Sequence, residues 1–403
     1  MCRRNEQDMK EVQVEVRDNT IRIMLSGRID SVNAEAIKDE IFAQIAGCPE
    51  IPVAVDASGL EYISSAGLRV LLRIRKDHSD MSIENVSTEI YDILDMTGFT
   101  EMMHVSKAFR QISVDGAEVI GRGANGTIYR IDEDSIVKVY HSSDSLDYIR
   151  HEREVARLAL ILGIPTAISY DVVRVGYRYG AVYELLNARS FSQILAEEPD
   201  KMDWCIDEYV SLLKKIHSTE VPDGKLPDFK ETANDWADFM LDYLPPETGK
   251  KLKNLIDAVP FNNHMIHGDY HTKNVVLAGD EVLLIDMDTL AIGDPVFEFG
   301  SIFNAFKGFS ELDPHVIEEF QGFSRETGLA FWNKVLEAYS GTDDPAVLQV
   351  MEDKARVLGY TRLIRRSIRR KGLEEEKTRA EIEHWKAELI ELIDKIDCLS
   401  YRC

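Results

Sequence analysis

The glycine-rich stretch VIGRGANGTIYRIDEDSIVKVY constrains the fold more than any other part of the sequence. Gly121, Gly123 and Gly126 form a G-x-G-x-x-G pattern, which in a dinucleotide-binding fold leads from a strand into a helix. Here apolar residues alternate over residues 127–131 and again over 136–140, so the loop joins two antiparallel strands. This pattern excludes a dinucleotide-binding fold and predicts a loop that covers phosphate groups.

A lysine follows one strand after the loop, and Lys138 lies between apolar neighbours. A glycine loop and a lysine in this order are typical of kinases, in which backbone N–H groups approach the nucleotide and the lysine neutralises the α and β phosphates. Such a lysine needs an anion beside it, and the next helix offers Glu152 and Glu154. The expected phosphate-binding positions of the loop are Gly121, Gly123, Ala124, Asn125 and Gly126.

The segment HGDYHTKNVVLAGDEVLLID combines a polar loop with a predicted hairpin. Two apolar strands turn at Gly279 and Asp280, so Asn274 and Asp286 lie at the same open end of the hairpin. An amide oxygen and a carboxylate make a suitable ligand pair for Mg²⁺. Asp269 lies on the loop that leads in and can receive the proton of an attacking hydroxyl. The segment is therefore predicted to be a catalytic loop.

The motifs HGDYHTKNVVL, LLIDMDTLAIGDP and LLKKIHS, with the short GIPTA connection, closely resemble the aminoglycoside phosphotransferase and choline kinase family. The resemblance runs from about residue 115 to at least residue 310. It implies a two-lobed, protein kinase-like fold and an enzyme that uses ATP and Mg²⁺, in most members on small molecules. Carried over, it implies Asp269 as the catalytic base, Asn274 and Asp286 as metal ligands, and Lys138 as a phosphate-binding residue.

The same resemblance implies roles for further positions. Counting back from the GIPTA connection favours Glu154 over Glu152 as the partner of Lys138. The main chain around Glu184 and Leu186 is expected to be the hinge that meets the adenine edge.

Several positions near the catalytic loop are expected to be structural or depart from the family pattern. His267 and His271 are expected to brace the loop by hydrogen bonds. Asp288 is expected to have a structural role, and the alternative is that it approaches the metal or the substrate. The pair Thr272–Lys273 replaces a small or Pro-Gly pair, and Glu298 stands where the family usually has aspartate. Neither change removes a ligand, so we expect an active kinase.

The first hundred residues follow a different pattern, in which strands alternate with helices and imply a mixed α/β sheet. The stretches SGRIDSVNAEAI and DASGLEYISSAGLRVLL resemble a STAS domain of the anti-sigma factor antagonist type, over roughly residues 10–110. In that family a partner kinase phosphorylates a serine at the start of the second helix, which switches protein binding. Ala66 occupies the usual phosphoserine position, so Ser65 is the candidate phosphosite. The alternative is that Ser64 or Ser65 only caps the helix.

Composition limits the classes of partner. The formal net charge of -24 argues against nucleic acid and anionic membranes and suits a cationic small molecule or a basic protein surface. No apolar run is long enough for a membrane helix, and the N-terminus lacks the apolar core of a signal peptide. The five cysteines show no metal or disulfide spacing, so we expect a reducing cytoplasm.

We therefore expect an α/β STAS-like regulatory domain followed by an α+β two-lobed kinase-like phosphotransferase domain. The expected parts are a STAS-like domain over 1–112, an N-lobe over 113–186 and a helical C-lobe over 187–403. The expected acceptor is the hydroxyl of a small molecule, and the STAS-like part is expected to bind a protein. The alternatives are a nucleotide-binding signalling adaptor and a protein kinase that acts on a STAS serine.

The stretch YTRLIRRSIRRKGLEEEK near the C-terminus contains a basic cluster before an acidic run. A solvated helix face is the favoured interpretation, and a site for a phosphorylated or acidic ligand is the alternative. The identity of the acceptor does not follow from these residues.

Overall fold

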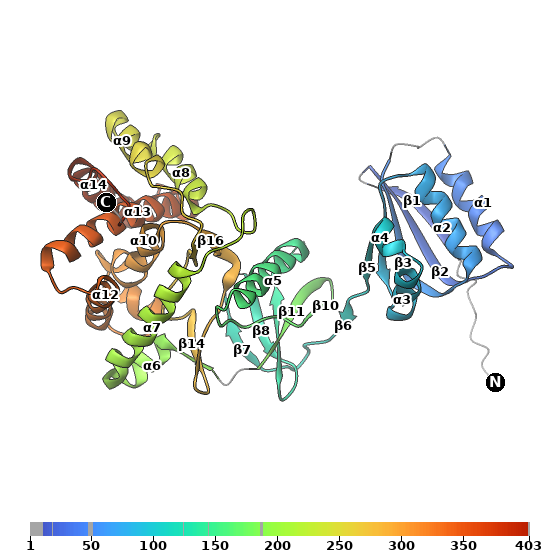
Figure 1. The fold of residues 1–403 in the computed structure, drawn as a ribbon, viewed down its shortest axis with the longest axis horizontal. Helices are drawn as coiled ribbons and strands as arrows, with labels where there is room; N and C mark the ends of the chain where they lie inside the picture. Colours follow the sequence, from blue (N-terminus) through green and yellow to red (C-terminus); the bar gives the residue numbers. More distant parts are fainter. Residues whose placement is uncertain are drawn as a thin grey trace. The chain divides into compact units, whose positions relative to one another are not determined.

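The structure is a computed structural model, and it describes residues 11–17, 19–46, 51–123, 125–143, 145–185 and 188–401. The chain divides into two compact units (Figure 1). One contains Met1–Ser113 and Val172–Gly176, and the other contains Val114–Asp171 and Tyr177–Cys403.

The first unit is built on a five-stranded mixed sheet with the order β1-β2-β3-β4-β5. β1 and β2 pair antiparallel, and the remaining neighbours pair in parallel. The strands are β1 (Val12–Arg17), β2 (Thr20–Ile29), β3 (Val53–Ile63), β4 (Met81–Val86) and β5 (His104–Lys107). The predicted α/β class of this part is confirmed.

Amphipathic helices supply the other half of the first core. They are α1 (Ala34–Ile45), α2 (Ser65–Asp77), α3 (Thr88–Met96) and the short α4 (Phe99–Met102). Their apolar residues recur at helical spacing and are buried against the strands, as in the pairs Ile37 and Ile41, Val70 and Ile74, and Ile90 and Leu94.

At the start of α2, the neighbouring residues Ser64 and Ser65 differ in their contacts. The hydroxyl of Ser64 accepts hydrogen bonds from the backbone N–H groups of Ala66, at 3.2 Å, and Gly67, at 3.4 Å. Ser65 is the first helical residue and is exposed. The cap is therefore Ser64, and Ser65 takes no part in it.

The second unit begins with an antiparallel sheet in which β11, β9, β8 and β7 are neighbours in that order. Its strands are β7 (Val119–Arg122), β8 (Gly126–Arg130), β9 (Ser135–Tyr140) and β11 (Arg178–Glu184), and α5 (Leu146–Ile161) contacts β11. Gly126 is required here, because a Cβ would lie 2.7 Å from the carbonyl oxygen of Val139. β10 (Asp171–Val175), most of which belongs to the first unit, pairs in parallel with β6 (Arg110–Gln111) of that unit.

The rest of the second unit is mostly helical. Its helices are α6 (Phe191–Glu197), α7 (Met202–Ser218), α8 (Phe229–Met240), α9 (Pro246–Asp257), α10 (Pro295–Phe306), α11 (His315–Gln321), α12 (Arg325–Ser340), α13 (Pro345–Lys371) and α14 (Glu376–Lys395). Its strands and single turns are β12 (Ala188–Ser190), η1 (Pro199–Lys201), β13 (Met265–Ile266), β14 (Val275–Ala278), β15 (Glu281–Leu284), η2 (Met287–Thr289), β16 (Ala291–Ile292) and η3 (Gly308–Ser310).

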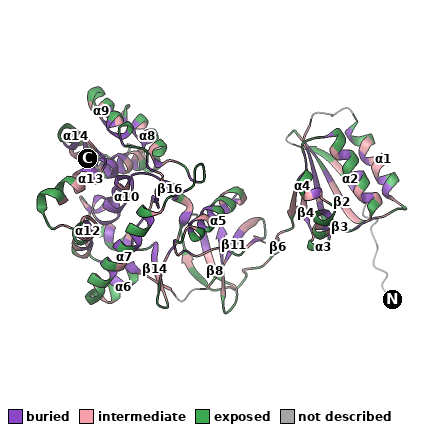
Figure 2. Ribbon diagram, viewed as in Figure 1, coloured by how far each residue is buried: buried purple, intermediate pink, exposed green. Residues whose placement is uncertain are grey.

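α10 lies at the centre of this helical part and is buried along most of its length (Figure 2). Large aromatic side chains surround it, among them Tyr209, Phe331, Trp332 and Tyr360, all nearly free of solvent contact. The predicted two-lobed, kinase-like class is confirmed, and α10 anchors the segments that carry the candidate site.

One expectation about cysteines needs correction. Cys398 is disulfide-bonded, whereas Cys205 is a buried free thiol. Spacing along the sequence does not determine which sulfur atoms the fold brings within bonding distance.

In the described residues, no helix has the length and apolar character needed to cross a bilayer.

The assignment of Ser64 as the N-cap of α2 can be tested by comparing it with Ser65. Replacing Ser64 with alanine removes the side-chain hydrogen bonds that cap the N-terminus of α2 and should destabilise the helix by about 1 kcal/mol. Hydrogen exchange measured by mass spectrometry on the full chain should then show roughly fivefold faster exchange over α2. Ser65→Ala is the matched control and should leave exchange unchanged. Equal rates in the two variants would contradict the assignment.

Candidate active site

The hairpin places two predicted metal ligands at one end. β14 and β15 pair antiparallel with Val275 opposite Leu284, and the N–H of Ile285 donates to the carbonyl of Asn274 at 2.9 Å. Asp286 follows directly, with a left-handed backbone at φ 63°. Such a conformation is uncommon outside glycine and is concentrated at functional sites. Asn274 and Asp286 thus lie close together, as the sequence pattern predicted.

Lys138 meets two carboxylates from different parts of the chain. Its Nζ lies 2.9 Å from Oε1 of Glu152 on α5 and 3.7 Å from Oδ1 of Asp286. Burial alone would lower the pKa of the Lys138 amine, but the charges of Glu152 and Asp286 outweigh that effect and raise the pKa. The lysine is therefore held as a cation beside the end of the hairpin.

The predicted partner Glu154 is wrong in this structure. Glu154 is exposed on α5, whereas Glu152 is buried and also accepts a hydrogen bond from the Tyr140 hydroxyl at 2.6 Å. The physical reason is helical periodicity, because Glu152 lies on the same face as the buried residues Ile149 and Val155. That periodicity is visible in the sequence and identifies Glu152 without any family comparison.

Asp269 is surrounded by basic groups. Nη2 of Arg362 on α13 lies 3.0 Å from its Oδ1, and Nε2 of His271 lies 3.6 Å from its Oδ2. Burial alone would raise the pKa of the Asp269 carboxyl, but His271 and Arg362 lower it well below its usual value. The side chain of Asn274 donates to the Asp269 carbonyl at 3.0 Å, which links the loop to the hairpin.

Arg362 belongs to the basic cluster near the C-terminus, and no sequence pattern connects it with the loop that carries Asp269. Its guanidinium also donates to the carbonyl of Gly268 at 3.0 Å and to the hydroxyl of Ser301 at 2.7 Å. It lies 93 residues beyond Asp269 in the chain, so no local sequence signal connects the two residues.

A buried carboxylate holds the predicted catalytic loop in place. Glu298 on α10 accepts hydrogen bonds from the N–H groups of His267, of Gly268 at 3.0 Å and of Tyr270 at 3.3 Å. His267 accepts from the N–H of Asp269 at 3.3 Å, so it braces the loop as expected. Gly268 has φ +81°, and a Cβ there would lie 2.7 Å from the carbonyl oxygen of Thr289. Only glycine suits that position.

A hydrogen-bonded chain connects the glycine loop with the segment after Asp286. Nδ2 of Asn125 donates to the Tyr148 hydroxyl at 3.0 Å, and this hydroxyl donates to Asp288. Burial and the charge of Asp286 raise the pKa of Asp288, against the opposing effect of the Tyr148 hydrogen bond. Tyr148 was not predicted, and Asp288 has the structural contact expected of it.

The remaining predicted positions lie around the glycine loop and β11. The N–H of Gly123 donates to the carbonyl of Gly126 at 2.9 Å, which closes the loop. Glu184 is exposed at the end of β11. The predicted positions Ala124 and Leu186 lie outside the described residues.

The donor atoms at the hairpin end suit Mg²⁺. The amide nitrogen of Asn274 is used by the Asp269 carbonyl, which leaves its oxygen for a ligand. Asp286 contributes a half-exposed carboxylate. Within the described ranges, no group of three or more His, Cys, Asp or Glu residues is arranged to hold a metal. Mg²⁺ commonly takes only one or two protein ligands and completes its shell with phosphates and water, so two oxygen donors fit it.

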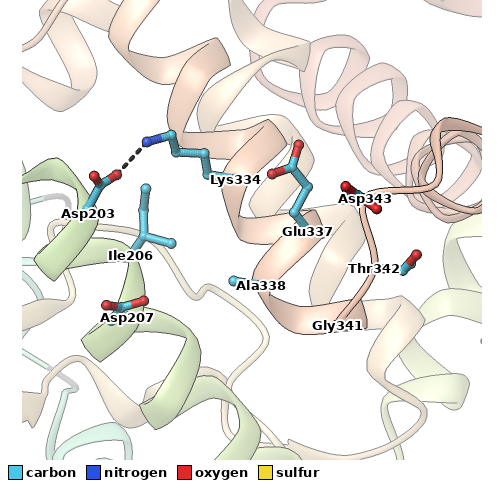
Figure 3. Close-up of a pocket in the computed structure, with 9 residues that line it drawn as sticks. All are labelled: Asp203, Ile206, Asp207, Lys334, Glu337, Ala338, Gly341, Thr342 and Asp343. Atoms are coloured by element: carbon cyan, nitrogen blue, oxygen red, sulfur yellow. Dashed lines mark hydrogen bonds and ion pairs between the residues drawn. The ribbon is translucent and has the colours of Figure 1, made fainter.

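A separate groove lies between α7 and α12 and has a volume of about 520 Å³ (Figure 3). Lys334 forms an ion pair with Asp203 at its edge. The lining residues are Asp203, Ile206, Asp207, Lys334, Glu337, Ala338, Gly341, Thr342 and Asp343. None of the predicted site residues lines this groove, so it is not part of the site around Asp269.

Sequence comparison identifies the two parts of the chain. The phosphotransferase enzyme family, APH, matches residues 116–332, and the STAS domain matches residues 11–112. The chain belongs to the phosphotransferase enzyme family and carries an N-terminal STAS domain.

Individual relatives fall into the same two groups. The chain is 33% identical over 95 residues to the Bordetella bronchiseptica protein named "Putative anti-sigma factor antagonist BtrV". This match covers 23% of this chain and 81% of that protein. Among solved structures, the streptomycin-ATP complex of APH(2'')-IIa is similar with 17% identity and a TM-score of 0.46, covering 77% of this chain and 99% of that one. ADP-bound APH(2'')-Ib has 16% identity and a TM-score of 0.45, covering 76% and 99%.

The partner of Lys138 can be tested by comparing two neighbouring glutamates. Replacing Glu152 with glutamine leaves a largely buried lysine without its nearest counter-charge and should cost about 2–3 kcal/mol of stability. Glu154→Gln changes an exposed side chain on the same helix and should cost less than about 0.5 kcal/mol. Tryptophan fluorescence during denaturant unfolding reports this, because all four tryptophans lie in the second unit. A larger loss for Glu154→Gln would contradict the pairing.

Proposed function

We propose that the second unit transfers the γ-phosphoryl group of ATP to a hydroxyl of a small molecule. The observation that carries this proposal is the convergence of Lys138, Asp286 and Asn274 beside the loop that holds Asp269. These residues come from strand β9, the end of the hairpin and the catalytic loop, and they combine a cation, a hard-ligand pair and a carboxylate base. That combination suits phosphoryl transfer, which depends mainly on positioning and charge stabilisation.

In the proposed mechanism, the backbone of the glycine loop and Lys138 bind the nucleotide phosphates. Asn274 and Asp286 would hold Mg²⁺, which when bound offsets negative charge on the phosphates. Asp269 accepts the hydrogen of the acceptor hydroxyl and orients its oxygen toward the γ-phosphorus. The bond from this oxygen to phosphorus forms as the bond from phosphorus to the ADP oxygen breaks, and the hydroxyl proton passes to Asp269. The products are ADP and a phosphomonoester.

The low pKa of Asp269 bears on its proposed role. A carboxylate whose pKa is lowered well below its usual value stays ionised at neutral pH and is a weak base. It is thus suited to orient the hydroxyl and to take its proton late, after the bond to phosphorus has largely formed. This matches a transition state in which the leaving group is already loosened.

The proposed division of labour follows the sequence boundaries, with a regulatory STAS part over 1–112, an N-lobe over 113–186 and a C-lobe over 187–403. We propose that the STAS part docks a protein partner. A phosphoswitch at Ser65 is supported by its exposure, since the adjacent Ser64 supplies the cap of α2. An added phosphate at a helix N-terminus would be stabilised by the helix dipole.

The role of Asp269 is tested by exchanging its carboxylate for an amide. Asp269→Asn should lower turnover of Mg-ATP with an acceptor by about 100-fold or more, because the amide cannot take the proton. Nucleotide affinity, measured by calorimetry, should change little. Asp280→Asn, at the exposed tip of the same hairpin, is the matched control and should keep full turnover. Turnover preserved in Asp269→Asn would exclude this residue as the base.

A further inference from the structure

The last turns of α13 carry five arginines, Arg362, Arg365, Arg366, Arg369 and Arg370, which we call the arginine stripe. Arg362 pairs with Asp269. Across the described part of the chain, no carboxylate oxygen lies within 4.0 Å of a side-chain nitrogen of the other four arginines. The Nε of Arg365 is buried and has no hydrogen-bond partner among the described residues. The stripe therefore begins at the proposed base, and its other four guanidinium groups form no direct ion pair in the described part of the chain.

Aromatic rings hold the guanidinium groups in place. The guanidinium of Arg362 lies 5.8 Å from the Trp236 ring centre, and that of Arg369 lies 5.3 Å from the centre of Phe239, both on α8. That of Arg366 lies 5.1 Å from the ring centre of Phe309 in η3. Such contacts orient a guanidinium but leave its net charge and its donors in place. The guanidinium groups of Arg362, Arg366 and Arg369 thus each lie over an aromatic ring.

The catalytic loop adds another cation to the same surroundings. Nζ of Lys273 lies 5.0 Å from the ring centre of Phe320. The ring centres of Phe320 and Phe309 are 6.4 Å apart, and Phe309 is the ring that contacts Arg366. Lys273 is one of the positions that depart from the family pattern. Arg362 of α13 thus reaches Asp269 directly, and Lys273 lies beside the ring cluster that also contacts Arg366.

The arginine stripe carries positive charge, whereas the whole chain has a formal net charge of -24. Charges farther away than about 8–10 Å are largely screened at physiological salt, so a ligand at Asp269 meets the nearby cations and not the net charge. Clustered arginines with few counter-charges are stabilised by a bound oxyanion, and the planar guanidinium matches a carboxylate or phosphate. A polyamine would meet repulsion at the same place.

We propose that the acceptor is an anionic alcohol, whose carboxylate or phosphate group binds the arginine stripe while its hydroxyl meets Asp269. This inference rests on the proposed phosphotransfer at Asp269. In the structure, Nη2 of Arg362 donates a hydrogen bond to Oδ1 of Asp269. An oxyanion on the acceptor competes for the Arg362 guanidinium and frees this oxygen to accept the hydroxyl hydrogen. The acceptor oxygen then bonds to the γ-phosphorus, the bond to the ADP oxygen breaks, and the proton passes to Asp269. The product carries one more phosphate group than the acceptor.

The test compares four small alcohols that differ in charge. Glycerate, glycerol 3-phosphate, glycerol and 3-aminopropane-1,2-diol are each titrated calorimetrically into the full-length protein at low salt. Mg-ADP is titrated into the same preparations as a separate measure of the nucleotide site. The variants are the double change Arg366→Gln with Arg369→Gln, the nucleotide-site change Lys138→Met, and Arg157→Gln as an exposed arginine on α5. Because Arg366 and Arg369 are exposed, their replacement should leave the fold intact.

The two anionic alcohols should bind, and glycerol and the amine should not. The double arginine variant should bind the anions roughly tenfold or more weakly, because charge-assisted hydrogen bonds are lost. Lys138→Met and Arg157→Gln should keep the anion affinity, which excludes binding at the nucleotide phosphate site. Anions that bind no better than glycerol, an amine that binds best, or undiminished anion binding in the arginine variant would each overturn the inference.

The Mg-ADP titration separates the two proposals. Mg-ADP binding without anion binding overturns the anionic acceptor and leaves phosphotransfer standing. Arginine-dependent anion binding without Mg-ADP binding overturns phosphotransfer instead, and with it the assignment of the bound anion as an acceptor.

Discussion

A buried carboxylate needs hydrogen-bond donors, and the donors that Glu298 uses determine much of the geometry of this site. It lies on α10, whose residues are buried along most of its length, and it accepts hydrogen bonds from three backbone N–H groups of the predicted catalytic loop. An ionised group without such donors would cost several kcal/mol, so the loop is held where the donors are satisfied. The loop conformation then follows, including the left-handed glycine at 268 and the placement of Asp269. Asn274 transmits the same constraint to the hairpin through its bond to the Asp269 carbonyl.

The geometry around Lys138 depends on a second balance of charges. Lys138 on β9 forms ion pairs with Glu152 of α5 and with Asp286 after β15. One ammonium group therefore links the sheet to the hairpin. The Asn125, Tyr148 and Asp288 chain makes another connection between the glycine loop and the same hairpin end. Both connections join segments more than a hundred residues apart, and both lie where phosphate groups would bind under the proposed mechanism. Positioning of this kind supplies a large part of catalysis in phosphoryl transfer.

Features encoded locally could be predicted from the sequence. The hairpin that brings Asn274 close to Asp286 follows from two apolar runs and a glycine turn, and the mixed sheet of the STAS domain follows from alternating strands and helices. The family spacing favours Glu154, whereas the apolar face of α5 selects Glu152. Two residues along a helix differ by about 200° in direction, so only one of the two can face the lysine. Arg362 and Tyr148 depend on contacts across 93 and 140 residues, which no local pattern encodes.

The central claim is that this site moves phosphate from ATP to a hydroxyl, and product analysis tests it most directly. Mg-ATP is incubated with the full-length protein and a panel of alcohols of positive, neutral and negative charge, and phosphorus NMR follows the products. The protein is checked for phosphate by mass spectrometry in the same samples. The account predicts equal amounts of ADP and one phosphomonoester with a single class of alcohol, and neither product with Asp286→Asn. ATP left intact with every alcohol, or phosphate found only on Ser65, would contradict it.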